Sequence, residues 1–210
     1  RLGIIRDLFA LSEAGEIDTT VALECAKLYK EETEYIVWVE LITGFGRIGN
    51  LLYGTPAYEP YRAYVRGILS SVIERVGWDT RTNESHNDTL LRSLVLGAGV
   101  SFGDKNTVNE ALKLFAKRNE TAIHADLRGV VYSAVAKNGK EKEYNTLLSM
   151  YKKEPLHEEK NRLLGALGLF TQKELLLKTL EFTMTEHVRM QDRNGSFASV
   201  LVNPHGRALG

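Results

Sequence analysis

The chain has little cysteine, no excess charge of either sign and no long apolar run. Cys25 is the only cysteine among 210 residues, which excludes an internal disulfide and a cysteine-built zinc site and predicts a reducing, cytoplasmic location. Because 27 basic residues balance 27 acidic ones, neither nucleic acid nor an anionic membrane is an expected partner. No apolar stretch approaches the ~20 residues that a membrane span requires.

Proline is also scarce, with four residues, and no proline-rich or low-complexity segment divides the chain. A chain of this length suffices for one ordinary domain or two small ones, and it can bury a substantial core. We predict a single helical domain over residues 1–210.

Apolar residues recur at the three- and four-residue spacing of a helix face along nearly the whole chain. In the first segment these residues are Ile4, Ile5, Leu8, Phe9 and Leu11. Gly15 follows where a left-handed residue would end the helix. Asp18 is the expected N-cap of a second helix, whose apolar residues are Val21, Leu23 and Leu28.

Further helix ends are marked by proline, glycine and hydroxyl residues. Pro60 and Gly77 bracket a long predicted helix, and the polar segment 78–87 is the expected long loop. Asn138-Gly139 ends another helix. Two pairs have the spacing of a capping box, in which a hydroxyl and a carboxylate each satisfy a backbone N–H: Thr107 with Glu110, and Thr171 with Glu174.

These signals predict about ten helices joined by short turns. Stacked helical hairpins of the HEAT or armadillo kind fit this pattern better than a closed bundle does. Because strict sequence repetition is absent, the predicted fold is an all-α, irregular α-solenoid.

One glycine pattern suggests a different protein class. Gly44-Phe45-Gly46-Arg47-Ile48-Gly49 fits the G-x-G-x-x-G fingerprint of a dinucleotide site, in which glycines let a pyrophosphate approach a helix N-terminus. The flanking residues 33–43 have helical spacing, and the chain after Gly49 is too short for a crossover helix. We therefore interpret the pattern as a glycine-loosened helix end and expect no cofactor-binding residue.

A second pattern resembles half of a zinc site. His157-Glu158-Glu159-Lys160-Asn161 differs from the H-E-x-x-H motif of zinc peptidases because Asn161 replaces the second histidine, and one imidazole cannot hold the metal. We instead expect Glu158 and Glu159 to place negative charge in the first turn of a helix. The sequence predicts no catalytic residue and no metal ligand.

Twelve short motifs follow one another along the chain. They are Arg1-Leu2-Gly3-Ile4, Glu32-Thr33-Glu34-Tyr35, Val37-Trp38, Gly77-Trp78, Leu90-Leu91-Arg92, Asp126-Leu127-Arg128, Val131-Tyr132, Glu158-Glu159-Lys160-Asn161-Arg162, Ala166-Leu167-Gly168, Val188-Arg189, Gln191-Asp192 and Asn203-Pro204-His205-Gly206-Arg207. In this order they resemble the motifs of one domain family, the C-terminal helical domain of zinc aminopeptidases of the puromycin-sensitive and tricorn-interacting type.

The resemblance implies a parent aminopeptidase, a hydrolase that removes N-terminal residues from peptides. Its zinc-binding catalytic domain would lie upstream of Arg1, and the final helices of the helical domain would lie downstream of Gly210. In such enzymes the helical domain covers the catalytic domain, limits substrate size and can contact the far end of a bound peptide. The expected partners are therefore the upstream catalytic domain and peptide substrates.

Arginine binds a peptide's terminal carboxylate well because its planar fork makes two parallel hydrogen bonds. The candidates for peptide contact are Arg92, Arg128, Arg189 and Arg207. Structural pairing is the alternative role, for Arg128 with Asp126 or Glu110, and for Arg189 with Asp192. A stand-alone solenoid scaffold that binds extended peptides or proteins is the alternative function.

Overall fold

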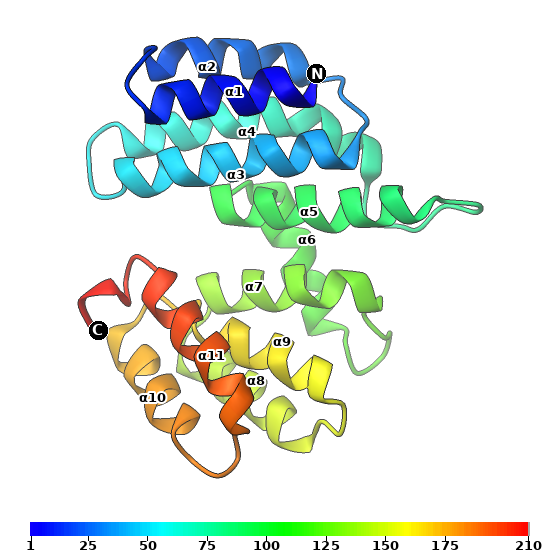
Figure 1. Ribbon diagram of the computed structural model, residues 1–210. Coiled ribbons are helices and arrows are strands. Elements are labelled where there is room, and N and C mark those ends of the chain that lie inside the picture. The colour runs from blue at the N-terminus through cyan, green and yellow to red at the C-terminus, as the bar shows by residue number, and fades with distance from the viewer. Residues whose placement is uncertain (210) are drawn as a thin grey trace. The chain divides into compact units, whose positions relative to one another are not determined.

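The computed structural model describes residues 1–209, and within them every regular element is helical (Figure 1). The α-helices are α1 (Leu2–Glu13), α2 (Thr19–Ala26), α3 (Tyr35–Leu52), α4 (Tyr58–Val76), α5 (His86–Phe102), α6 (Lys105–Ala116), α7 (Arg128–Asn138), α8 (Glu141–Lys153), α9 (His157–Leu167), α10 (Lys173–Thr183) and α11 (Met190–Val202). Short 3-10 turns are η1 (Lys27–Tyr29), η2 (Ala125–Leu127) and η3 (Arg207–Leu209). The predicted all-α class is confirmed.

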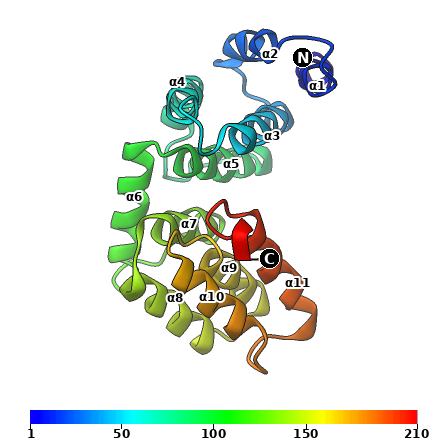
Figure 2. The same ribbon diagram turned by 90° about the vertical axis from the view of Figure 1, so that its left-hand side faces the viewer.

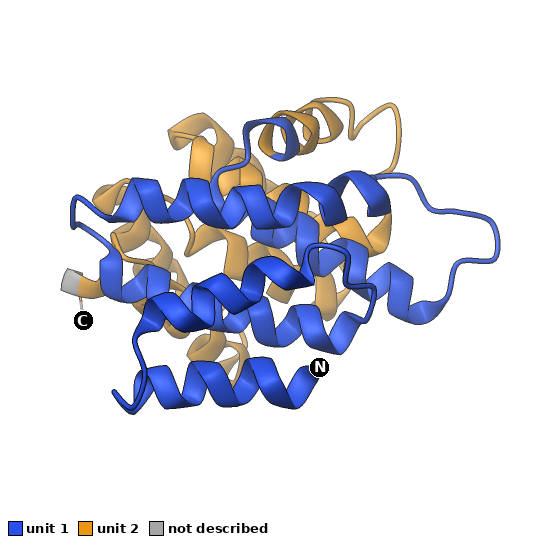
Figure 3. Ribbon diagram, turned by 90° about the horizontal axis from the view of Figure 1, so that it is seen from above, with its two compact units in different colours: residues 1–107 blue, residues 108–210 orange. Residues whose placement is uncertain are grey.

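The chain divides into two compact units, Arg1–Thr107 and Val108–Gly210, which we call unit 1 and unit 2 (Figure 3). Their charges differ although the whole chain is neutral. Unit 1 carries 11 basic and 15 acidic residues, a net charge of −4, whereas unit 2 carries 16 and 12, a net charge of +4. The balanced composition therefore conceals an acidic half and a basic half.

Helical hairpins stack in chain order within each unit (Figure 2). In unit 1 the α1–α2 hairpin packs on α3 through α1, and both α3 and α4 pack on α5. In unit 2, α7 packs on α8 and α9, and α9 also packs on α11. This succession of neighbouring hairpins confirms the solenoid-like arrangement that the sequence predicts.

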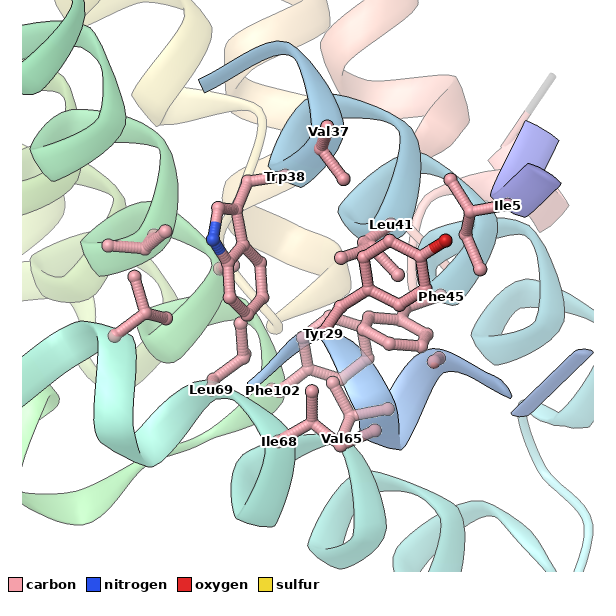
Figure 4. Packing of buried hydrophobic residues seen from close by; sticks show 14 of the residues in the cluster. Ile5, Tyr29, Val37, Trp38, Leu41, Phe45, Val65, Ile68, Leu69 and Phe102 are labelled. Carbon is pink, nitrogen blue, oxygen red and sulfur yellow. The ribbon is translucent and has the colours of Figure 1, made fainter. Parts of the chain in front are cut away.

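The core of unit 1 is built around α3 (Figure 4). Trp38 is fully buried, and its indole N–H donates to the main-chain oxygen of Glu32 at 2.9 Å. About two turns further along α3, Phe45 meets Phe9 of α1 edge to face, with ring centroids 6.2 Å apart. Val65 and Leu69 complete the contact from α4. The fully buried residues of α3 thus fix the neighbouring helices through large apolar side chains.

The glycine pattern lies inside α3, which continues to Leu52. A Cβ on Gly44 would lie 2.5 Å from the Phe9 ring, so glycine is required there for the close approach of α1. The interpretation of this segment as helix is confirmed, and the alternative interpretation as a dinucleotide-binding loop is wrong. The predicted helix end is also wrong, because packing against α1 stabilises the helix despite the cost of about 1 kcal/mol per interior glycine.

Glycines mark two helix ends as predicted. After α1, Gly15 has φ +75°, and the N–H groups of Gly15 and Glu16 donate to the oxygens of Ser12 and Leu11. After α4, Gly77 has φ +60° and donates to Ile73 at 3.0 Å. Asn138 ends α7, although Gly139 is extended there with φ −88°. The long loop between α4 and α5 is confirmed over residues 77–85.

Both predicted capping boxes are wrong. Helix α6 begins at Lys105, and the carboxylate of Asp104 accepts the Thr107 N–H at 2.8 Å, so an acid three residues earlier satisfies this group. Helix α10 begins at Lys173 after Gln172, without a side-chain cap. The capping box that does form joins Ser85 and Asp88 at the start of α5, and aspartate in place of glutamate hid it.

The N-terminus of α2 is placed as predicted, but its details differ. Asp18 occupies the N-cap position without a side-chain hydrogen bond to the helix. Val21 and Leu28 are exposed, and the residues of α2 that are buried are Ala22 and Ala26. The alanines face the neighbouring helix because their small side chains allow a close approach of the two backbones.

Unit 2 buries hydroxyl and amide groups among its apolar side chains. The Thr183 and Ser196 hydroxyls join α10 to α11 at 2.6 Å. Thr179 donates to the Leu175 oxygen at 2.9 Å. The Asn203 amide donates to the oxygens of Gly168 and Phe170 at 2.9 and 2.7 Å. These buried polar groups are therefore satisfied within the unit, as buried polar groups must be.

No helix in the described residues combines the length and the apolar character needed to cross a membrane.

Candidate functional site

The four arginines proposed for peptide contact are divided between the units. Arg92 belongs to unit 1, and Arg128, Arg189 and Arg207 belong to unit 2. The predicted set therefore does not gather in one compact unit, and the surroundings of each arginine must be considered separately.

Arg92 lies on α5 with only 2% of its side chain exposed. Its two Nη groups donate to the two carboxylate oxygens of Glu84, and its Nε donates to the Val76 oxygen at 3.2 Å. The Arg92 guanidinium holds the pKa of the Glu84 carboxyl below its ordinary value. A peptide carboxylate could reach this guanidinium only by displacing Glu84. The geometry thus gives Arg92 a firm role in anchoring the loop before α5.

Arg128 is the first residue of α7, directly after the 3-10 turn η2. Its Nε donates to the Ile123 oxygen at 3.2 Å, and its Nη1 lies 3.5 Å from Glu159 Oε2. About a third of the side chain, 34%, is exposed. Of the carboxylates expected near it, Asp126 lies 3.5 Å from His124 Nδ1 and Glu110 pairs with Lys113. Arg128 is therefore both oriented and accessible, and it keeps donors for a further acceptor.

Glu159 is the centre of a cluster that joins α7 to α9. Its carboxylate accepts the Tyr132 hydroxyl at 2.7 Å and pairs with both Arg128 and Arg162. Only 4% of the Glu159 side chain is exposed. Burial, together with the hydrogen bond to Glu159, raises the pKa of Tyr132, so this hydroxyl stays a donor. The prediction that Glu158 and Glu159 lie in the first turn of a helix is confirmed for α9, and the burial of Glu159 beside α7 is an addition to it.

The remaining residues of the half zinc motif point to different partners. The Glu158 side chain is 86% exposed and pairs with Arg162 at 2.9 Å, and His157 is exposed. Asn161 donates to Asp192 Oδ1 at 3.1 Å. Within residues 1–209, no three histidine, cysteine, aspartate or glutamate side chains gather in a way that could hold a metal ion.

Arg189 precedes α11 and pairs with Asp192, as the structural alternative predicts. The Arg189 Nε donates to Asp192 Oδ2 at 2.7 Å, and this hydrogen bond holds the pKa of Asp192 below its ordinary value. Helix α9 therefore contributes a residue beside each of these arginines. Glu159 pairs with Arg128, and Asn161 donates to Asp192, the partner of Arg189. Arg207 lies exposed in η3, near the end of the described chain.

Two arginines near the long loop, one partly buried and one exposed, were not identified from the sequence. Arg75 of α4 donates to the Glu32 oxygen, and Arg81 of the loop donates to the Arg75 oxygen. Nothing in the sequence marks them, because spacing along the chain does not reveal which arginines pair with a main-chain oxygen instead of a carboxylate.

Comparison with known proteins identifies the family of the chain. Residues 1–209 match the family described as ERAP1-like C-terminal domain. The chain belongs to this family. Thus the resemblance proposed from the ordered motifs is confirmed over the whole described chain.

Relatives with this domain are aminopeptidases by name. The chain is 31% identical over 201 residues to Aminopeptidase M1-A of Oryza sativa subsp. japonica, covering 91% of the chain and 23% of that protein. It is 30% identical over 198 residues to Aminopeptidase 2 of Candida albicans, covering 91% and 21%. It is also 30% identical over 203 residues to Aminopeptidase M1 of Arabidopsis thaliana, covering 91% and 23%. The chain thus spans less than a quarter of the length of these relatives.

Proposed function

We propose that the chain is the non-catalytic C-terminal domain of a zinc aminopeptidase that removes N-terminal residues from peptides. The observation that carries the proposal is the match of residues 1–209 to a domain family whose aligned relatives are named aminopeptidases. In this proposal the domain covers the active site of the parent enzyme and limits which substrates reach it.

Stacked helical hairpins suit this role. Each hairpin contacts its neighbours in sequence, so a stack presents a continuous surface on which an extended peptide can lie. Movement of such a stack relative to a catalytic domain would open and close the route to the active site. The domain would thereby act on substrate access without contributing a reacting group.

Arg128 is the strongest of the four proposed peptide contacts. Glu159 and the Ile123 oxygen fix its guanidinium, yet a third of the side chain reaches water. A peptide's terminal carboxylate could therefore accept the Arg128 donors that remain without moving Glu159. Arg189 and Arg207 are further contacts in this proposal, and Arg92 is the weakest because Glu84 occupies its fork.

The zinc ion of the parent would be held by residues outside this chain. In the proposal, the chain's principal partner is the catalytic domain upstream of Arg1, and residues 1–210 form one helical domain whose final helices follow Gly210. The single cysteine is in keeping with a cytoplasmic location. The chemistry of peptide hydrolysis would be supplied by the metal and its general base in the upstream domain.

The test is aminopeptidase activity, measured with aminoacyl-amide reporters and added zinc, on the parent polypeptide and on residues 1–210 alone. The proposal expects hydrolysis by the parent, loss of that hydrolysis with a chelator, and none by residues 1–210. Hydrolysis by residues 1–210 would contradict the proposal. A parent that has no peptidase activity but binds extended peptides would instead support the scaffold alternative.

A further inference from the structure

A hollow opens beside the loop between α4 and α5 in unit 1. It has a volume of about 310 Å³ and is bordered by the end of α4, the loop and the first turns of α5. Its polar lining includes Thr33, Arg75, Arg81, Thr82, Glu84 and Asp88. The proposed role in substrate access does not involve this hollow, so its chemistry can be considered independently.

The two acidic residues of the hollow are already satisfied by neighbours. Glu84 receives both Nη groups of Arg92, and Asp88 accepts the N–H and the hydroxyl of Ser85 at 3.2 and 2.6 Å. These hydrogen bonds hold the pKa of both carboxyls below their ordinary values. The two acids therefore stay ionised near neutral pH, and their lone pairs are largely engaged.

The two arginines of the hollow have a different kind of partner. Arg75 donates to the Glu32 oxygen and Arg81 to the Arg75 oxygen, and both acceptors are uncharged main-chain groups. Within the described chain, neither guanidinium forms an ion pair with a carboxylate, although the Arg81 charge acts on Asp88 at longer range. Each arginine has five N–H donors, so most remain available.

The charged groups of the lining differ in their partners. Glu84 and Asp88 are its two carboxylates, and Glu84 is paired with Arg92, which lies outside the lining. Arg75 and Arg81 are its two guanidiniums, and within the described chain neither is paired with a carboxylate. Two guanidiniums without a paired carboxylate are the electrostatic setting in which an anion is drawn to one place.

We propose that this hollow binds the oxyanion group of a small ligand, a carboxylate or a phosphate. Arg75 and Arg81 supply charge-assisted hydrogen bonds, and the hydroxyls of Thr33 and Thr82 supply further donors. A carboxylate could come from a free organic acid or a peptide end, and a phosphate from the free ion or a phosphorylated metabolite. Both groups present anionic oxygens that accept hydrogen bonds from the arginines.

The test is a calorimetric titration of the whole parent polypeptide at fixed ionic strength, with inorganic phosphate in one arm and acetate in the other. The proposal expects saturable binding in at least one arm. Arg81→Gln, which changes an exposed residue, should weaken that binding at least about tenfold, which corresponds to about 1.4 kcal/mol, because a charge-assisted hydrogen bond is lost. Arg75→Gln should do the same. The arm that binds distinguishes phosphate from carboxylate ligands.

Arg66→Gln is the matched control. Arg66 also lies on α4 and also donates to a main-chain oxygen, that of Phe102 at 2.8 Å, but it does not line the hollow. Its substitution should leave anion affinity unchanged. The proposal is overturned if neither anion binds saturably, or if Arg66→Gln weakens binding as much as Arg81→Gln does. Because Arg81 is exposed, a failure of Arg75→Gln to fold would leave the test intact.

Discussion

The long helices α3, α4 and α5 of unit 1 have 18, 19 and 17 residues, whereas the helices α7 to α11 of unit 2 have 11 to 13. The two units also differ in the kinds of residue that they bury. Unit 1 buries Trp38, Phe45 and their apolar neighbours. Unit 2 adds buried hydrogen bonds between side chains, such as those of Thr183 with Ser196 and Tyr132 with Glu159.

Helix length decides which kind of contact holds neighbouring helices together. A helix of about five turns buries an apolar stripe long enough to hold its neighbours by surface area alone. A helix of about three turns buries less, so specific polar contacts can fix which neighbour it meets and in which register. We therefore expect unit 1 to respond most to loss of volume and unit 2 to loss of polar partners.

The largest expected effect is in unit 1. Trp38→Ala should lower the free energy of unfolding by about 3–5 kcal/mol, because a fully buried indole leaves a large cavity. Trp78→Ala is the matched control, since Trp78 is only half-buried in the loop after α4, and it should cost much less. Hydrogen exchange with mass spectrometry would locate the loss of stability, and equal losses for both variants would contradict the expected difference between a buried and a half-buried indole.

In unit 2 the largest effect should come from a charge. Glu159→Gln should lower the free energy of unfolding by about 2–3 kcal/mol, because it leaves Arg128 and Arg162 without their shared carboxylate. Both arginines are partly exposed, which keeps this loss below the usual range for a buried ion pair. The control Glu158→Gln changes an exposed residue on the same turn and should shift stability by less than about 0.5 kcal/mol. Denaturant unfolding measures both variants, and similar small shifts would contradict the account.

The hydroxyl contact between α10 and α11 should matter less. Thr183→Val should cost about 1–2 kcal/mol, because the buried Ser196 hydroxyl loses its side-chain partner. Adding Ser196→Ala should recover part of this loss, since no buried hydroxyl then lacks its partner. A double-mutant cycle from melting curves measures the coupling. Strict additivity of the two single variants would show that the contact contributes nothing specific.

A smaller effect on stability is expected from helix capping, which two aspartates of unit 1 allow us to compare. Asp104→Ala should cost about 1 kcal/mol, because its carboxylate accepts the Thr107 N–H. Asp18→Ala should be nearly neutral, since Asp18 makes no side-chain bond to α2. Unfolding midpoints of the two variants provide the comparison, and a larger loss at Asp18 would contradict the observed geometry.

The smallest expected effect is on the pH dependence of stability in acid, and it involves both units. Arginine partners hold the pKa values of Glu84 in unit 1 and Asp192 in unit 2 below the ordinary value of about 4. A lowered folded-state pKa adds stability above the unfolded-state pKa, and this stability is lost as pH falls through the folded-state value. Glu84→Gln and Asp192→Asn should therefore each flatten the stability curve below about pH 4. Unchanged acid unfolding in both variants would be the contrary result.

Much of the fold could be predicted because helix signals are local. Apolar spacing identified the helices, and Gly15 and Gly77 marked ends because their left-handed backbone is a property of the residue itself. Capping was harder to predict. Asp104, and not Thr107, accepts a backbone N–H at the start of α6. Which of several neighbouring polar residues caps a helix depends on the geometry of the preceding loop.

Less of the candidate site could be predicted, because it depends on tertiary contacts. The pairing of Arg189 with Asp192 was predicted, since the two residues lie one turn apart. The burial of Glu159 and Arg92 was not, because it arises where other parts of the chain cover them. The hollow beside Arg75 and Arg81 has no sequence signature, since its lining comes from three separate segments.

We propose that this domain governs how a parent aminopeptidase admits peptides. The most direct test measures kcat/KM of the parent for a series of peptides from about 2 to about 16 residues, with Arg128→Ala and Arg128→Lys compared to the unchanged enzyme. The account predicts a clear length dependence, and a change in Arg128→Ala confined to the longer peptides. Length-independent turnover, or an equal effect of Arg128→Ala on every peptide, would contradict it.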